Sequence, residues 1–321
     1  MKYNVGMLVF FITVYFIFSG FIQRVPGVNK QHFINVRDAA GIKKFFKYTD
    51  DRIPFISSHR GGPRAGFPEN CIPTFENTLA RTWSILEIDP HYTKDSAIVL
   101  MHDKTLNRTS NGSGKVSDYT LEEIRKIKLK DTEGAVTEFG ISTLDEVLEW
   151  SKGKTIMVLD EKDVPAEVRA RKIIEHHAEA SAMLIVYSFA DAVKVHAISK
   201  DIMMEVMIPD AEKLKSFDST GVSWSNVVAF VTHTQPTNAG IYKMIHDKGS
   251  MCITGSSRTI DREFIRSVNK DTAALKSGYD KLIRSGTDII EADLGIEAGE
   301  SLEAFNRKGS SKKSFFHIKN K

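Results

Sequence analysis

The stretch IPFISSHRGG at residues 53–62 decides the fold, because a short apolar strand runs directly into ionisable residues and two glycines. Similar apolar segments recur along the chain, and most are separated by segments of helical periodicity. They show little alternation of apolar and polar residues, which is typical of parallel strands covered on both faces. The predicted strands are 53–58, 84–88, 97–101, 155–159, 183–188, 202–208, 227–231, 251–254 and 288–292.

Helical patterns fill most of the gaps between these strands, at 74–83, 144–151, 167–179, 190–199 and 241–247 among others. Strand alternating with helix predicts an α/β fold with a parallel sheet and right-handed crossovers. A TIM-like (β/α)8 barrel absorbs eight such units. Nine strands are predicted, so one is extra, and the link 89–97 is too short for a helical crossover.

A polar excursion interrupts the barrel after the third predicted strand. Residues 104–142 include Gly112, Gly114 and Gly134 and only one clear helix start, where Thr120 and Glu123 form a capping-box pattern. We therefore expect a small insertion of loop, turn and helix over the barrel mouth.

The two ends of the chain differ from the barrel in composition. Residues 3–23 carry no charge and lie between Lys2 and Arg24, which is typical of a signal peptide or an N-terminal membrane anchor. The expected organisation is a leader or anchor at 1–24, a connector at 25–50, a barrel domain at 51–306 and a basic tail at 307–321. The tail is expected to be solvated and frayed. The protein is therefore expected to be exported, as a periplasmic, extracellular or membrane-anchored protein.

Charge and cysteine content exclude some classes of function. The formal net charge of +3 does not favour a nucleic-acid partner, which would require a clustered basic face. Cys71 and Cys252 lie in unlike settings, so a disulfide between them is not favoured, and they lack the spacing of a cysteine metal site. The sequence does not indicate an oligomeric state.

Ionisable residues gather at the carboxyl ends of five predicted strands. In a parallel barrel these ends open onto one face, where the active site of such a barrel lies. Five strands that end in this way are far more specific than any single motif. The pairs are His59 with Arg60, Glu87 with Asp89, His102 with Asp103, Asp160 with Lys162, and Glu291 with Asp293.

Three carboxylates among these residues predict a metal site. Glu87 and Asp89 are alternate residues of one strand, so their side chains point the same way. Two close carboxylates repel each other unless a cation or a proton lies between them. Asp160 supplies a third carboxylate from another strand, and oxygen ligands suit Mg²⁺ or Ca²⁺.

The remaining residues at this face suit phosphate chemistry. Arg60 and Lys162 offer positive charge to a phosphate oxygen. His59 and His102 lie on different strands, as a general base and a general acid require. Gly61 and Gly62 permit a close approach of the backbone to a ligand. Histidines outside this setting are taken as helix-face or loop residues, namely His176, His177, His196, His233 and His246.

Two segments carry a resemblance to a known family. SSHRGGPRAGFPENCIPTFENTL at 57–79 and LEIDPHYTKDSAIVLMHDKTLNRTSNGSGKVSDYTLEEI at 86–124 resemble the glycerophosphodiester phosphodiesterase family. The shared order is HRG, PENT, E-x-D, T-x-D-G, and HD followed by L-x-R-T. The resemblance continues more weakly through IMVLDEKD, VYSF and GTDIIEAD.

The resemblance implies a TIM barrel that hydrolyses glycerophosphodiesters to an alcohol and glycerol 3-phosphate. It implies that His59 and His102 form the acid–base pair, that Arg60 contacts the phosphate, and that Glu87 and Asp89 bind the metal. Glu69 of the PEN motif resembles a supporting glutamate, and Asp160 and Lys162 fall where the family has E-x-K.

Four departures from the family pattern stand out. Asp160 is one methylene shorter than the usual glutamate, Cys71 replaces the threonine of PENT, and Ser96 replaces the glycine of T-x-D-G. Glu291 and Asp293 belong to an EAD-Leu segment where T-D-x-P is usual, and they are expected to support the site or to lie at its rim.

Two other functions stay open from the sequence. A related barrel, of the phosphatidylinositol phospholipase C or sphingomyelinase D-like type, would carry a similar site for another substrate. A catalytically inactive barrel that binds phospholipid or glycan is the third alternative, although the intact histidines and the E-x-D pair argue against it.

Overall fold

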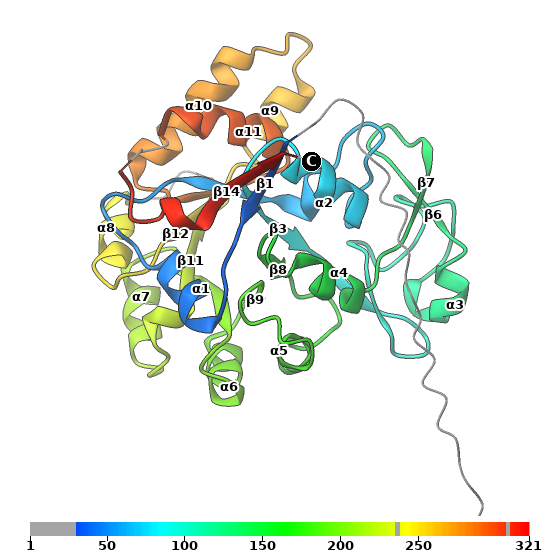
Figure 1. Cartoon of the computed structure of the whole chain (residues 1–321), viewed down its shortest axis with the longest axis horizontal. Coiled ribbons are helices and arrows are strands. Elements are labelled where there is room, and N and C mark those ends of the chain that lie inside the picture. The colour runs from blue at the N-terminus through cyan, green and yellow to red at the C-terminus, as the bar shows by residue number, and fades with distance from the viewer. Residues whose placement is uncertain (1–29, 235–237, 306–308, 321) are drawn as a thin grey trace, which may run out of the picture.

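The computed structural model describes residues 30–234, 238–305 and 309–320, and its centre is a closed barrel of eight parallel strands. The ring runs β10–β11–β12–β13–β2–β3–β8–β9 and closes from β9 onto β10 (Figure 1). This confirms the predicted (β/α)8 fold. The strands are β2 (Phe55–Ser58), β3 (Ser84–Ile88), β8 (Met157–Leu159), β9 (Ala182–Val186), β10 (Met203–Met207), β11 (Val227–Thr232), β12 (Cys252–Gly255) and β13 (Ile289–Ala292).

Helices surround the barrel and cover the outward side chains of the strands (Figure 1). Thr143, Ser188 and Asp210 each begin a helix by accepting a hydrogen bond from a backbone N–H in its first turn. The helices are α2 (Ile72–Leu79), α4 (Leu144–Ser151), α5 (Ala166–Glu175), α6 (Phe189–Ile198), α7 (Ala211–Asp218), α8 (Gly240–His246), α9 (Ile260–Arg266), α10 (Thr272–Ser285) and α11 (Gly295–Leu302), with 3-10 turns η3 (Trp224–Asn226) and η4 (Glu303–Phe305).

The insertion follows the second barrel strand, not the third predicted strand. The predicted strand 97–101 contains β5 (Ile98–Leu100), which lies outside the barrel and pairs antiparallel with β4 (Pro90–Tyr92). The short link before it permits a hairpin and no crossover, so the extra strand is this one. The insertion continues through η2 (Val116–Asp118), α3 (Leu121–Ile124), β6 (Lys128–Lys130) and β7 (Val136–Gly140), and Thr120 and Glu123 form the predicted capping box.

The two ends of the described chain pair with each other, and the expectation of a frayed tail is wrong for residues 309–320. After the turn η5 (Lys313–Phe315), β14 (Phe316–Asn320) pairs antiparallel with β1 (Lys30–Ile34), and α1 (Ala39–Phe46) follows β1 (Figure 1). Phe315 and Phe316 are buried against Phe45 and Phe55 at the amino-terminal pole of the barrel. The tail is ordered because its aromatic residues pack into the core at this pole.

The expected signal peptide or anchor lies outside the described residues. Within the part that the structure describes, no helix is both long and apolar enough to cross a bilayer.

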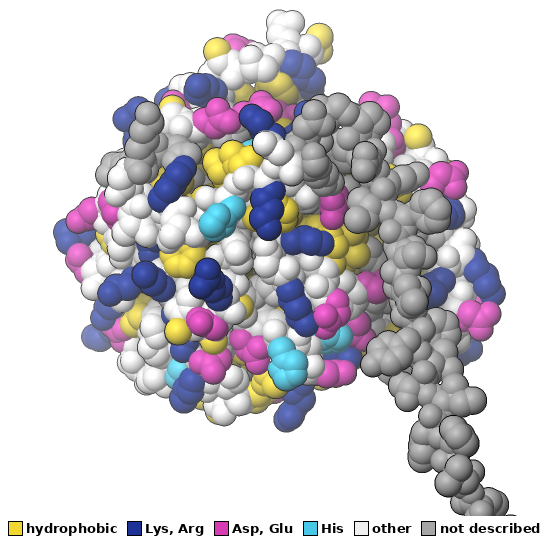
Figure 2. Space-filling view, in the orientation of Figure 1, with side chains coloured by type: hydrophobic (Ala, Val, Ile, Leu, Met, Phe, Trp, Pro, Cys, Tyr) yellow, Lys and Arg dark blue, Asp and Glu magenta, His cyan; other side chains and the backbone are white. Residues whose placement is uncertain are grey.

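On the face shown in Figure 2, basic and acidic side chains are interspersed.

Arg169 of α5 is a fully buried cation that connects two barrel strands. Its guanidinium donates to the carbonyl oxygens of Leu159 at 2.7 Å, Ile185 at 3.0 Å and Val164, and to the Glu161 carboxylate at 2.8 Å. These bonds hold the carboxyl ends of β8 and β9 together, directly beneath the segment that carries Asp160 and Lys162.

Replacing Arg169 with methionine is expected to lower the free energy of unfolding by about 3–5 kcal/mol, because three carbonyls and a carboxylate lose their donor inside the fold. Urea denaturation measures the change. Arg171→Met, at an exposed position of the same helix, serves as the control. A loss below about 1 kcal/mol would show that the network is not needed to hold these strands.

Candidate active site at the carboxyl ends of the strands

A cavity of about 300 Å³ opens at the carboxyl ends of the barrel strands, as the sequence predicted. Seven of the ten predicted site residues line it: His59, Arg60, Glu87, His102, Asp160, Lys162 and Glu291. Of the other three, Asp89 lies next to Glu87 and Asp160, whereas Glu69 and Asp293 line an adjoining cavity that shares His59 and Arg60. The structure therefore brings all ten residues to one end of the barrel.

The three predicted metal ligands converge. One oxygen from each of Glu87, Asp89 and Asp160 lies within 4.8 Å of the others, and all three residues are buried. Burial and the neighbouring Asp89 raise the pKa of Glu87 well above its usual value, which is the expected result of like charges held together. An all-oxygen donor set fits a hard divalent cation, so the residues present suit Mg²⁺ or Ca²⁺.

Polar neighbours orient Asp160. Lys162 contacts Asp160 and also lies 3.0 Å from an Asp89 oxygen, while the Tyr187 hydroxyl donates to Asp160 at 2.6 Å. The shorter side chain still reaches the cluster, because Asp160 follows β8, which pairs directly with the β3 strand of Glu87.

Asn70 is a buried member of the PEN segment and is not among the predicted site residues. Its amide nitrogen donates to Asp89 at 2.6 Å, and its amide oxygen accepts from the Asp89 backbone N–H at 3.0 Å. Its backbone has φ of 62°, a left-handed conformation that asparagine tolerates better than most residues. Asn70 therefore fixes both the position and the rotamer of Asp89.

Replacing Asn70 with alanine is expected to weaken binding of the divalent cation by about 10- to 100-fold, because Asp89 loses the partner that orients it. Isothermal calorimetry with Mg²⁺ or Ca²⁺ measures the affinity, and Asn269→Ala, at an exposed position, is the matched control. An unchanged affinity would mean that Asp89 is held adequately without Asn70.

His59 follows β2 in the turn η1 (His59–Gly61) and is held by two carboxylates. Its Nδ1 lies 2.6 Å from Asp293, and its Nε2 lies 4.0 Å from Glu87. Burial disfavours the imidazolium, but the hydrogen bond to Asp293 and the charges of Glu87 and Glu291 outweigh it and raise the His59 pKa to about 10. Asp293 therefore both orients the ring and favours its protonated form.

His102 has a similar arrangement in the insertion. Its Nδ1 lies 2.8 Å from Asp103, which accepts hydrogen bonds from Arg108 at 2.8 and 2.9 Å. The Arg108 hydrogen bond lowers the pKa of Asp103 strongly. Arg108 also bonds Glu69 at 2.8 Å, and Glu69 in turn bonds Arg60 at 3.1 Å. Glu69 thus links the Arg60 turn to the insertion.

The two glycines after Arg60 are required by the packing of the turn. Both adopt positive φ, 83° for Gly61 and 82° for Gly62. A Cβ on Gly61 would lie 2.3 Å from the Phe75 ring, and one on Gly62 would lie 2.8 Å from the Thr78 hydroxyl. The glycines therefore allow the turn to pack against α2.

Several residues of the cavity were not predicted as site residues. Tyr187, Glu205, His233 and Arg258 all line it. Glu205 could have been found, because it interrupts the inward-facing positions Met203 and Met207 of β10 with a charge. His233 is predicted to be a helix-face or loop residue, and only the tertiary structure shows that it lines the cavity.

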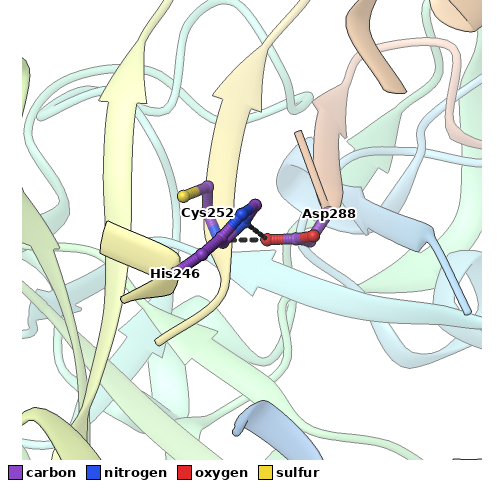
Figure 3. Close-up of side chains that lie close together, drawn as sticks. All are labelled: His246, Cys252 and Asp288. Atoms are coloured by element: carbon purple, nitrogen blue, oxygen red, sulfur yellow. Dashed lines mark hydrogen bonds and ion pairs between the residues drawn. The ribbon is translucent and has the colours of Figure 1, made fainter. Parts of the chain in front are cut away.

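A second group of metal-type ligands lies at the opposite pole, where β12 and β13 begin. Asp288 accepts hydrogen bonds from His246 at 2.8 Å and from the Cys252 backbone N–H at 2.7 Å (Figure 3). Asp288 also pairs with Arg52. The Cys252 sulfur points away from the carboxylate, and burial raises the pKa of this thiol well above its usual value. Arg52 already balances the charge of Asp288, and the hydrogen bonds of this carboxylate join α8 to the beginnings of β12 and β13.

The fold and the site together define a class: an α/β barrel with a buried carboxylate cluster, two carboxylate-bonded histidines and basic residues around one cavity. The model of the glycerophosphoryl diester phosphodiesterase family matches residues 59–236. The chain belongs to this family.

Comparisons with individual proteins agree. A solved glycerophosphoryl diester phosphodiesterase from Parabacteroides distasonis is 40% identical, with a TM-score of 0.85, over 89% of this chain and 99% of that one. A glycerophosphodiester phosphodiesterase of Caldanaerobacter subterraneus is 39% identical over 110 residues, which are 32% of this chain and 42% of the relative. The chain spans less than half the length of the first curated relatives it matches.

A more distant structure shares the fold. The phosphodiesterase of Oleispira antarctica, solved in complex with its product sn-glycerol-3-phosphate, is 17% identical with a TM-score of 0.57 over 78% of this chain and 97% of that one.

Proposed function

We propose that this protein is a metal-dependent glycerophosphodiester phosphodiesterase that releases an alcohol and glycerol 3-phosphate. The observation that carries the proposal is the site itself. His59 and His102 each bond a carboxylate through Nδ1, and both line the cavity that Glu87 and Asp160 also line. A hydrogen-bonded Nδ1 fixes each ring and leaves Nε2 for proton transfer.

The proposed binding step uses the basic residues of the cavity. Arg60 and Lys162 bind the phosphodiester oxygens, since both line the cavity beside the carboxylate cluster. A divalent cation held by Glu87, Asp89 and Asp160 would neutralise charge that builds on the phosphate in the transition state. Its identity, Mg²⁺ or Ca²⁺, is left to experiment.

The proposed chemical step is acid–base catalysis by the two histidines. One imidazole takes the proton from the attacking hydroxyl, and the other protonates the alkoxide as the phosphorus–oxygen bond to the alcohol breaks. In a glycerol-based substrate the neighbouring hydroxyl acts as the nucleophile, and water then opens the cyclic phosphate. Asp293 and Asp103 stabilise the imidazolium that each histidine forms.

Product identity tests this proposal against the related barrels. The full-length chain is incubated with glycerophosphodiesters, phosphatidylinositol and sphingomyelin, and the products are followed by ³¹P NMR. We expect glycerol 3-phosphate and free alcohol from the glycerophosphodiesters. A phosphorylated headgroup or a ceramide phosphate as the main product would favour the phospholipase C or sphingomyelinase D-like function. No turnover of any substrate by a folded protein would favour a binding barrel.

Export, with residues 1–24 as a signal peptide or membrane anchor, is part of the proposal and rests on the leader sequence alone. Fractionation of cells that express a tagged chain tests it, and recovery in the cytosol would contradict it.

A further inference from the structure

Glu205 is a buried acid in the floor of the active-site cavity. It lies in the middle of β10, opposite Ile185 of β9 and Val228 of β11 in the strand register. Its side chain lines the cavity although the residue is only 1% exposed. In the inner layers of a barrel of this kind, branched apolar residues normally occupy such a position.

One oxygen of the Glu205 carboxylate is buried without a hydrogen-bond partner. Within the described residues, its Oε2 is buried and accepts no hydrogen bond. The charged groups that act on it most strongly are Glu291, Asp160 and Glu87, all of them negative. Burying a carboxylate without a partner is energetically unfavourable. The site therefore favours a bound ligand that carries a positive charge.

The cations that the fold itself supplies are largely engaged elsewhere. Lys162 contacts Asp89 and Asp160, and Arg60 bonds Glu69. Arg258, which also lines the cavity, is exposed, whereas Glu205 is buried. The divalent cation of the proposed site would be held by Glu87, Asp89 and Asp160, a group that does not include Glu205. The carboxylate at the floor therefore remains for a positive group on the substrate.

The neighbours of Glu205 indicate what kind of cation fits. Ile185, Met207 and Phe230 line the cavity with it, and Met207 and Phe230 are register partners on β10 and β11. A hard divalent ion requires several oxygen ligands, which these three side chains lack. An organic ammonium group instead gains from an aromatic ring and a polarizable thioether beside one carboxylate.

We infer that Glu205, with Phe230 and Met207, forms a subsite for an ammonium group on the alcohol half of the substrate, and that it selects diesters with cationic headgroups. This inference rests on the proposed function. The substrates that carry the required chemistry are glycerophosphodiesters of amino alcohols, with a primary or quaternary ammonium two carbons from the ester oxygen.

The experiment compares wild type with Glu205→Gln on three diesters, glycerophosphocholine, glycerophosphoethanolamine and the neutral glycerophosphoglycerol, at a fixed metal concentration. We expect Glu205→Gln to lower kcat/KM by about 10- to 100-fold for the two cationic substrates, mainly through KM, because a charge-assisted contact is lost. We expect less than a twofold change for glycerophosphoglycerol. Phe230→Leu should reduce the same two values by a smaller factor.

Controls separate the subsite from general effects. Glu300→Gln removes the same charge from an exposed position of α11 and should change none of the values. Melting temperatures establish that each variant is folded. An equal loss on all three substrates, or no loss on any of them, would overturn the inference.

Failure of the proposed function gives a different result, namely no turnover of any diester by wild type. Calorimetric binding of glycerophosphocholine and glycerophosphoglycerol to wild type and to Glu205→Gln then decides the inference by itself. Tighter binding of the cationic compound that is lost in the variant would support it, and equal binding of the two would overturn it. If Glu205→Gln does not fold, the same comparison is made on wild type and Phe230→Leu.

Discussion

Replacing His102 with alanine is expected to lower kcat by about 10²–10⁴-fold, the usual contribution of one general acid or base. The ring is bonded at Nδ1 by Asp103, which is itself fixed by Arg108, so a single nitrogen remains to exchange a proton with the substrate. Alanine removes that nitrogen and leaves the carboxylate cluster in place. Steady-state release of glycerol 3-phosphate measures the loss.

His59→Ala is expected to have an effect of the same size, because the proposed reaction needs one proton acceptor and one proton donor. His317→Ala is the matched control, since His317 is exposed on β14 at the far pole of the barrel. Near-normal turnover in either His59→Ala or His102→Ala would refute the assignment of the acid–base pair.

Glu87→Gln is expected to lower affinity for the divalent cation by at least about 100-fold and to reduce turnover with it. Loss of a direct ligand should exceed the 10- to 100-fold effect of losing an orienting partner. The substitution keeps the size of the side chain. In the structure the Arg60 backbone N–H donates to Glu87 at 2.7 Å, and the amide oxygen of glutamine can still accept this hydrogen bond. The change therefore removes charge with little loss of packing.

The same variant should be more stable than wild type in the presence of a chelator. The raised pKa of Glu87 means that its ionised form opposes folding at neutral pH, and glutamine relieves the repulsion from Asp89. Thermal melts with and without metal test both effects. A melting temperature that still rises with metal as in wild type would place the cation away from Glu87.

The main part of the site was predictable from the sequence because a parallel barrel brings every strand end to one pole. That rule located His59, Glu87, Asp160 and Glu291 without knowledge of the strand order. The E-x-D spacing of β3 likewise predicted that two carboxylates would converge.

Contacts between segments that are not strand ends were not predictable in this way. The bond between Asn70 and Asp89, and the one between Arg108 and Glu69, join loops whose paths depend on how the insertion packs. Glu205 is a different case: it lies within the predicted strand 202–208, and its isolated charge among methionines and valine was a signal available in the sequence.

The beginning of the insertion and the end of the chain were mispredicted for a similar reason. Strand periodicity does not distinguish β5, which pairs in a hairpin, from a barrel strand of the same length. The basic composition of residues 307–321 predicted a solvated tail. Phe315 and Phe316 are nevertheless buried, because their partners lie near the other end of the described chain.

The most direct test of a metal-dependent phosphodiesterase centre is the rate of glycerol 3-phosphate release from glycerophosphoethanolamine by the full-length chain. The rate is measured after dialysis against EDTA, and again after Mg²⁺ or Ca²⁺ is restored. We predict that the chelated protein is folded but inactive and that one of the two ions restores turnover. An undiminished rate in EDTA would contradict the metal centre, and no turnover under any of these conditions would contradict the proposed activity.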